Sequence, residues 1–110
     1  MKIHMAHICL IALLLVLGAH EASAEVIRWQ VDGQTREAIV YAPTAPRSDK
    51  DVPLVLSFHG YGDNAQNFQH TGVHVAWPDA VVVYFQGLET RGGLPGWLVE
   101  PDNDNRDLKL

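Results

Sequence analysis

The sequence is poor in cysteine, in clustered basic residues and in long apolar runs. Its 110 residues contain one cysteine, Cys9, so the chain cannot form a disulfide within itself. Lys and Arg number 8 against 13 Asp and Glu, which gives a net charge of −5, and the basic residues are scattered. We therefore expect no nucleic-acid partner, because nucleic-acid binding needs a concentrated basic surface.

The first 24 residues have the layout of a secretory signal peptide. Lys2 precedes an apolar run, Ile8 to Gly18, which is well short of the roughly 20 residues that a membrane-spanning helix needs. Ala22-Ser23-Ala24 has the small-x-small form of a signal-peptidase site. We expect residues 1–24 to be removed and the mature chain to be secreted or periplasmic, without stable membrane insertion. An uncleaved membrane anchor is the alternative.

The residues that follow predict a β-hairpin. Val26 to Val31 alternates apolar and polar residues, and Arg36 to Ala42 has the composition of a second strand. Asp32-Gly33 between the two runs is a typical hairpin turn, although a longer connection also fits. A proline-rich and charged stretch, residues 43–51, is expected to form a surface loop.

The middle of the chain predicts a βαβ unit. Leu54 to Phe58 and Ala80 to Phe85 are almost continuously apolar, as strands covered on both faces should be. Between them, Asp63 to Trp77 predicts a helix that is capped at its start and stopped by Pro78, with Gly72 weakening its middle. Strand, helix and strand in this order favour a parallel sheet.

The end of the chain, Asp102 to Leu110, predicts the first turns of a helix. One complete helix and one beginning are too few to cover both faces of a mainly parallel sheet. The fold class is therefore α/β, and we expect residues 25–110 to be the N-terminal part of a larger, apparently truncated domain. A small α+β protein that packs the hairpin over the sheet is the alternative.

The most informative motif is His59-Gly60-Tyr61-Gly62, which follows the first apolar strand. Gly60 to Ala65 fits the dinucleotide pattern G-x-G-x-x-[G/A], but that fold places an acidic residue at the end of the next strand. The next strand here ends in Tyr84-Phe85-Gln86, without an acid. We therefore reject the nicotinamide interpretation and expect no cofactor.

A serine hydrolase uses a glycine turn at the same place for a different purpose. Attack on an ester carbonyl puts negative charge on oxygen, and one backbone N–H aimed at that oxygen lowers the barrier by about 3–4 kcal/mol. In α/β-hydrolases one such donor lies in a His-Gly loop after an early strand. Glycines let that backbone turn without a side chain that would block the substrate.

The order of the surrounding motifs resembles one family closely. After the predicted hairpin come PLVLSFHGYGDNAQNF (53–68), AVVVYFQG (80–87), Gly96-Trp97 and DNRDLKL (104–110). This arrangement resembles the N-terminal portion of secreted polyhydroxybutyrate depolymerases and feruloyl esterases, which are α/β-hydrolases, from about Arg36 onward. The resemblance implies a serine carboxylic-ester hydrolase that acts on a small-molecule or polymeric ester.

The resemblance also implies roles for individual residues. The oxyanion loop falls on His59, Gly60, Tyr61 and Gly62, with the Tyr61 backbone N–H as the donor. Trp97 is a candidate wall of the substrate cleft, although plain packing explains an indole in a loop equally well. The family often has tyrosine or proline followed by Gln/Asp-Gly where this chain has Tyr84-Phe85-Gln86-Gly87, so Phe85 is a mild departure that leaves the strand prediction intact.

The catalytic nucleophile is missing from the sequence. The family holds its serine in G-x-S-x-G, followed by Asp and His, but Ser48 lies in the proline-rich loop and Ser57 lies inside a predicted strand. We therefore expect the isolated chain to be inactive, with the nucleophile and triad in a missing segment. The alternative is a non-catalytic exported binding or degenerate module of the same fold.

Two groups of residues resemble metal sites only loosely. His70 and His74 have the i, i+4 spacing of a zinc pair, but Gly72 interrupts the helix and no third ligand is evident. Asp102, Asp104 and Asp107 lack the glycine and the terminal glutamate of a calcium loop. We expect no metal, and we interpret the acids as a helix start.

Overall fold

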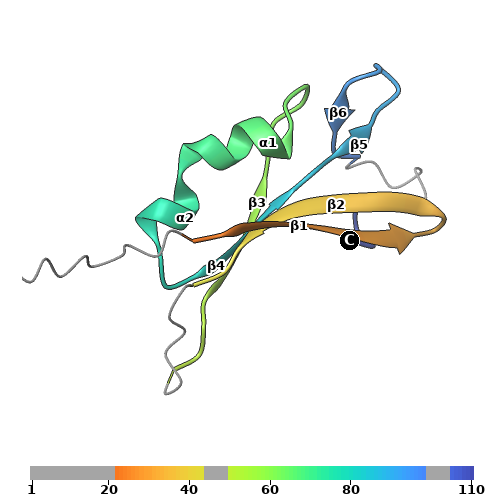
Figure 1. Cartoon of the computed structure of the whole chain (residues 1–110). Coiled ribbons are helices and arrows are strands. Elements are labelled where there is room, and N and C mark those ends of the chain that lie inside the picture. Colours follow the sequence, from red (N-terminus) through yellow and green to blue (C-terminus); the bar gives the residue numbers. More distant parts are fainter. Residues whose placement is uncertain (1–21, 44–49, 99–104) are drawn as a thin grey trace, which may run out of the picture.

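A computed structural model describes residues 22–43, 50–98 and 105–110, and these form a small mixed α/β domain (Figure 1). The four strands of its main sheet are β1 (Ala24–Val31), β2 (Gln34–Tyr41), β3 (Leu54–Phe58) and β4 (Val81–Phe85), in the spatial order β1-β2-β4-β3. Only β3 and β4 are parallel, whereas β1 with β2 and β2 with β4 are antiparallel. The prediction of a mainly parallel sheet is therefore wrong for this part of the chain, because the hairpin joins the same sheet.

The predicted hairpin is confirmed, with the shorter of the two connections. Asp32 and Gly33 alone join the strands, and their φ angles of 48° and 76° are those of a type I′ turn. This turn matches the right-handed twist of the strands that it joins. The register runs from Ala24 opposite Tyr41 to Val31 opposite Gln34, so β2 begins two residues before the predicted start.

The predicted helix is present but broken into short pieces. These are α1 (Ala65–Phe68), a 3₁₀ turn η1 (Gln69–Thr71) and α2 (Val73–Ala76). The Asn64 side chain caps the first piece by accepting a hydrogen bond of 2.8 Å from the Asn67 N–H. Gly72, with φ +76°, ends η1 in the left-handed conformation, and α2 starts after it. The helical segment ends just before Pro78, as predicted.

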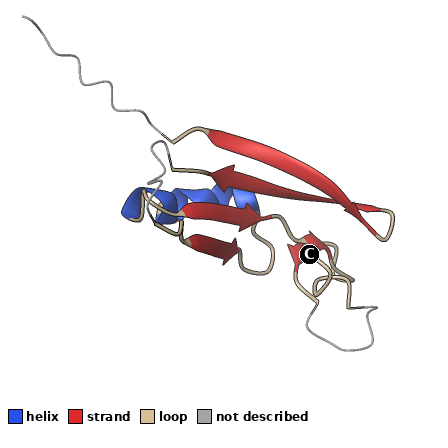
Figure 2. Ribbon diagram, turned by 90° about the horizontal axis from the view of Figure 1, so that it is seen from below, coloured by secondary structure: helices blue, strands red, loops and turns tan. Residues whose placement is uncertain are grey.

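The helices cover one face of the sheet, and the core lies between them (Figure 2). The helix-facing residues of the two central strands are Ile39 on β2 and Val82 and Tyr84 on β4. They are buried together with Ala65 and Ala80, and partly buried apolar residues pack around them (Tyr41, Val55, Phe68 and Val73). Burial of these apolar side chains is the main contribution to the stability of the domain.

The opposite face of β3 is open, in contrast to the prediction that this strand is covered on both faces. Leu54, Leu56 and Phe58 are 63%, 51% and 45% exposed. They alternate with Val55 and the buried Ser57, which face the helices. β3 also lies at the edge of the sheet. The described residues therefore account for the apolar residues on its helix-facing side but not for those on its open side.

Two further segments follow β4. The glycine-rich stretch after β4 contains a small hairpin of β5 (Leu88–Glu89) and β6 (Pro95–Gly96). Residues 105–110 form turns instead of the predicted helix, with Asn105 at φ 50° and the Leu108 N–H donating to the Asn105 carbonyl at 2.9 Å. The rest of that predicted helix lies outside the described residues.

Most of the predicted signal peptide, residues 1–21, also lies outside the described residues. Within the part that is described, no helix is long and apolar enough to cross a bilayer.

Candidate functional site

The His-Gly-Tyr-Gly loop follows β3 directly and forms a tight turn. The Asp63 N–H donates to the Gly60 carbonyl at 3.1 Å, and Gly62 has φ +81° while Tyr61 does not have a positive φ. These features define a type II turn with Tyr61 and Gly62 at its centre, and such a turn requires a positive φ at its third position. The sequence places a glycine there because any residue with a Cβ would be strained.

The imidazole of His59 fixes the start of this loop. His59 is 2% exposed, and its Nε2 accepts a hydrogen bond of 2.9 Å from the Gly87 N–H. The proton is therefore on Nδ1, which donates to the Gly60 carbonyl at 2.7 Å. The neutral ring thus joins the loop after β3 to the loop after β4. This geometry assigns His59 to loop positioning rather than to proton transfer.

Gln86 holds the other end of the loop, and sequence reasoning did not identify this role. Its Oε1 accepts from the Ala65 N–H at 2.9 Å, and its Nε2 donates to the Gly87 carbonyl at 3.0 Å. The same Nε2 lies 3.5 Å from His59 Nε2. The available signal was its position directly after a buried strand that runs parallel to β3, because such strands end at the same edge of the sheet.

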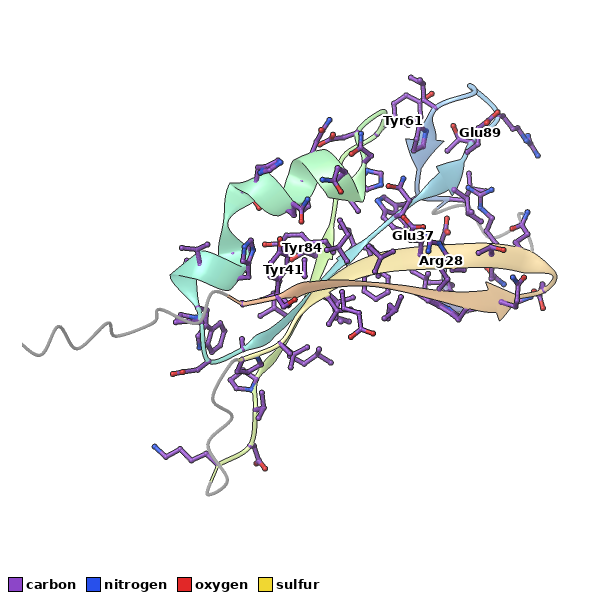
Figure 3. The ribbon with its side chains drawn as sticks, in the orientation of Figure 1. Arg28, Glu37, Tyr41, Tyr61, Tyr84 and Glu89 are labelled. Atoms are coloured by element: carbon purple, nitrogen blue, oxygen red, sulfur yellow. The ribbon has the colours of Figure 1, made fainter. Side chains whose placement is uncertain are left out.

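Tyr61 lies at the tip of the turn, beside the β5–β6 hairpin (Figure 3). Its side chain is 65% exposed, and a Cβ added to Gly96 would lie 2.9 Å from its Cδ2. The neighbouring Gly62 N–H is occupied, since it donates to the Pro95 carbonyl at 2.8 Å. By contrast, the Tyr61 N–H has no hydrogen-bond acceptor among the described residues. The Gly60 N–H likewise has no acceptor among those residues, so the loop contains two unpaired N–H groups, at Gly60 and Tyr61.

Trp97 both packs against the loop and lines a cavity. Its Nε1 donates to the His59 carbonyl at 2.8 Å, and its ring meets that of Phe58 edge-on with centroids 5.1 Å apart. It also lines a cavity of about 340 Å³ on the open face of the sheet, together with Phe58, Leu98, Asn105, Asp107, Leu108 and Leu110. Tyr61 does not line this cavity, so the cavity and the unpaired N–H are separate features.

The two histidines of the helical segment form no metal site with a third ligand. No group of three or more His, Cys, Asp or Glu side chains is arranged to hold a metal within residues 22–43, 50–98 and 105–110. The His74 ring stacks on Tyr41 at 3.6 Å, and its Nδ1 lies 2.9 Å from the Tyr84 hydroxyl. Burial, and secondarily the charge of His70, lower the pKa of His74 below its ordinary value of 6.5. His74 is therefore a half-buried histidine that packs against the edge of the core, as the sequence interpretation of an ordinary histidine allowed.

Asp107 has a structural partner. Its Oδ1 lies 3.0 Å from Nη2 of Arg36, and both side chains are buried. Its Oδ2 accepts from the Leu98 N–H at 2.6 Å. The carboxylate therefore fastens the C-terminal turn to β2, a role that the sequence could not show because the two residues are far apart in the chain.

Neither Ser48 nor Ser57 is seen in the geometry of a nucleophile. Ser57 is buried in the middle of β3, and Ser48 lies outside the described residues. The described residues therefore place no serine hydroxyl beside the His-Gly loop as a nucleophile.

Comparison with known proteins does not identify a family. No family model matches the chain. A search of curated proteins likewise found no match.

Proposed function

We propose that residues 25–110 are the oxyanion-loop part of an exported serine carboxylic-ester hydrolase, similar to polyhydroxybutyrate depolymerases and feruloyl esterases. The observation that supports this most strongly is the Tyr61 N–H, left unpaired in a turn that is held from outside by Gly87, Pro95 and Gln86. The nucleophilic serine and its Asp and His partners come from sequence outside these 110 residues.

In this mechanism the loop acts after the serine has attacked the ester. The serine oxygen bonds to the carbonyl carbon, its proton passes to the histidine of the triad, and the carbonyl oxygen becomes negatively charged. The Tyr61 N–H donates to that oxygen. The alcohol then leaves with the proton, and water hydrolyses the acyl-enzyme without a cofactor. The donor is effective because its position is fixed before the charge develops.

A non-catalytic exported binding module is the second candidate. It is favoured by the burial of Ser57 in β3 and by the cavity of about 340 Å³, which is lined mostly by apolar side chains. Such a cavity suits an apolar ligand.

The first experiment is to read the gene beyond the codon of Leu110 and to assay the protein that it encodes. The ester-hydrolase proposal expects G-x-S-x-G, then Asp and His, and turnover of a p-nitrophenyl ester. The 110-residue chain alone should show none. A stop codon with no such sequence in any frame would support the binding module instead. Turnover of the ester by the 110-residue chain alone would contradict the claim that its nucleophile is missing.

The second experiment removes the donor and preserves the turn. Tyr61→Pro deletes the N–H, and proline is a preferred residue at this position of a type II turn. We expect kcat of the encoded enzyme to fall by about 100- to 1,000-fold. Tyr61→Phe keeps the N–H and should keep kcat within about twofold of wild type. Equal activity of the two variants would assign the donor to another residue.

A further inference from the structure

The loop after β4 holds the oxyanion loop at both of its ends. Phe58 and Phe85 are partners in the parallel register of β3 and β4, so the residues that follow them lie at one edge of the sheet. Gly87 donates to His59 at the start of the loop, and Gln86 accepts from Ala65 at its end. Two consecutive residues thus fix a segment that runs from residue 59 to residue 65.

Gln86 is itself rigidly placed. Its backbone N–H donates to the Glu37 carbonyl of β2 at 2.9 Å, and both polar atoms of its carboxamide are used. Its Nε2 bonds the carbonyl of Gly87, the residue whose N–H sets the tautomer of His59. A change at Gln86 therefore reaches the loop by two routes, one through Ala65 and one through Gly87 and His59.

We propose that Gln86 is a positioning residue for the Tyr61 N–H. Its carboxamide holds the peptide units on both sides of the turn, so that the unpaired donor has one orientation when a substrate oxygen arrives. This inference rests on the proposed function for its catalytic consequence, although the positioning itself is a property of the loop. Geometric precision of this kind matters because a misplacement of about 1 Å lowers rates by up to about 100-fold.

The chain offers a matched control for Gln86 in Gln69. Gln69 is buried, its Oε1 accepts from the Tyr41 hydroxyl at 2.8 Å, and its Nε2 donates to the Gln66 carbonyl at 3.0 Å. Each glutamine therefore makes one accepted and one donated hydrogen bond of nearly equal length. Only Gln86 bonds the loop. Gln86→Met and Gln69→Met should destabilise the protein similarly and differ in their effect on the loop.

The test measures amide hydrogen exchange and steady-state kinetics of both variants in the protein as its gene encodes it. We expect the amides of Gly62, Asp63, Ala65 and Gly87 to exchange at least about tenfold faster in Gln86→Met than in Gln69→Met. We expect kcat to fall about 10- to 100-fold only in Gln86→Met, with KM unchanged. Equal exchange in the two variants overturns the inference. Faster exchange in a protein without esterase activity keeps the positioning role and removes the proposed function.

A second variant covers the case in which Gln86→Met does not fold. Gln86→Glu keeps an oxygen that accepts from the Ala65 N–H and loses the amide that donates to the Gly87 carbonyl. We expect faster exchange at Gly87 with Ala65 still protected. Unchanged exchange at Gly87 contradicts the route through His59.

Discussion

The chain contains two tight turns with a glycine at positive φ, and they differ in what surrounds them. In the hairpin turn, Gly33 has φ +76° and no atom lies within 4 Å of where its Cβ would be. In the loop after β3, Gly62 has a similar φ of +81°, but its N–H is bonded to Pro95. The first turn is set by its own two residues and the strands beside it. The second is held by residues from two other places in the chain, Gln86-Gly87 after β4 and Pro95 in β6.

This difference separates a turn that is set locally from one that is tied to other segments of the chain. The hairpin turn has an exposed contact, in which Lys109 donates to the Asp32 carboxylate, and exposed ion pairs contribute little stability. In the loop turn the Gly87 N–H donates to His59, and the Pro95 carbonyl and the Gln86 side chain accept from Gly62 and Ala65, while the Tyr61 N–H has no acceptor among the described residues.

The largest expected effect comes from the buried ion pair between Arg36 of the hairpin and Asp107 of the C-terminal turn. Asp107→Asn leaves the Arg36 guanidinium buried without its counter-charge, so the free energy of unfolding should fall by about 3–5 kcal/mol. Urea unfolding followed by circular dichroism measures this. A loss below about 1 kcal/mol would contradict the burial of the pair.

Valine at each glycine compares the two turns directly. Gly62→Val and Gly33→Val each force a branched side chain into the left-handed region, which costs about 1–2 kcal/mol of stability or more. If the proposed esterase function holds, only Gly62→Val should also lower kcat, by about 100-fold. Thermal unfolding and an ester assay on both variants provide the comparison. Equal kcat losses would remove the functional distinction between the turns.

Acid should weaken the helical segment that follows the second turn. Because the folded state lowers the pKa of His74, the unfolded state binds its proton first as the pH falls. The contribution of His74 is present in full above pH 6.5 and is lost as the pH falls from there through the folded-state pKa. Urea midpoints measured between about pH 8 and pH 5 should fall with acidification.

Two variants test the source of that pH dependence. His74→Asn removes the titrating group, so the stability of this variant should depend less on pH than that of the wild type. His70→Asn removes only the smaller of the two causes and should keep most of the dependence. An identical pH dependence in wild type and His74→Asn would contradict the assignment.

The smallest expected effect is on the exposed contact of the hairpin turn. Lys109→Ala removes the ion pair with Asp32, and both side chains are largely exposed. The free energy of unfolding should change by at most about 0.5 kcal/mol, and less at high salt. Measured beside Asp107→Asn, this variant compares an exposed ion pair with a buried one. Both ion pairs join the C-terminal turn to the β1–β2 hairpin.

The sequence predicted the elements whose causes are local. Asp32-Gly33 specifies its own turn type, and the apolar runs of β3 and β4 specify strands because they are bounded by Pro53, Asp79 and Gly87. The βαβ unit follows from their order and is confirmed by the parallel register. The break at Gly72 was foreseen as a weakness in the helix and is present.

Features that depend on distant contacts were not predictable. Nothing local marks Gln86 as the partner of Ala65, or Asp107 as the partner of Arg36, because both pairs are made by the way the strands are arranged. The pairing of β2 with β4 also escaped prediction, since an isolated hairpin pattern does not reveal which strand it will join. The residues of the His-Gly loop were identified correctly as a turn, while the role of the Tyr61 N–H stays a prediction.

The open face of β3 has a thermodynamic consequence. Leu54, Leu56 and Phe58 are already in contact with water in the folded domain, so unfolding hydrates less new apolar surface than it does in a fully covered sheet. The heat capacity of unfolding and the urea m-value both scale with newly exposed surface. For the described domain we therefore expect a smaller heat capacity change of unfolding per residue than in a fully covered sheet. Its stability should consequently vary less steeply with temperature than that of a covered sheet of the same length.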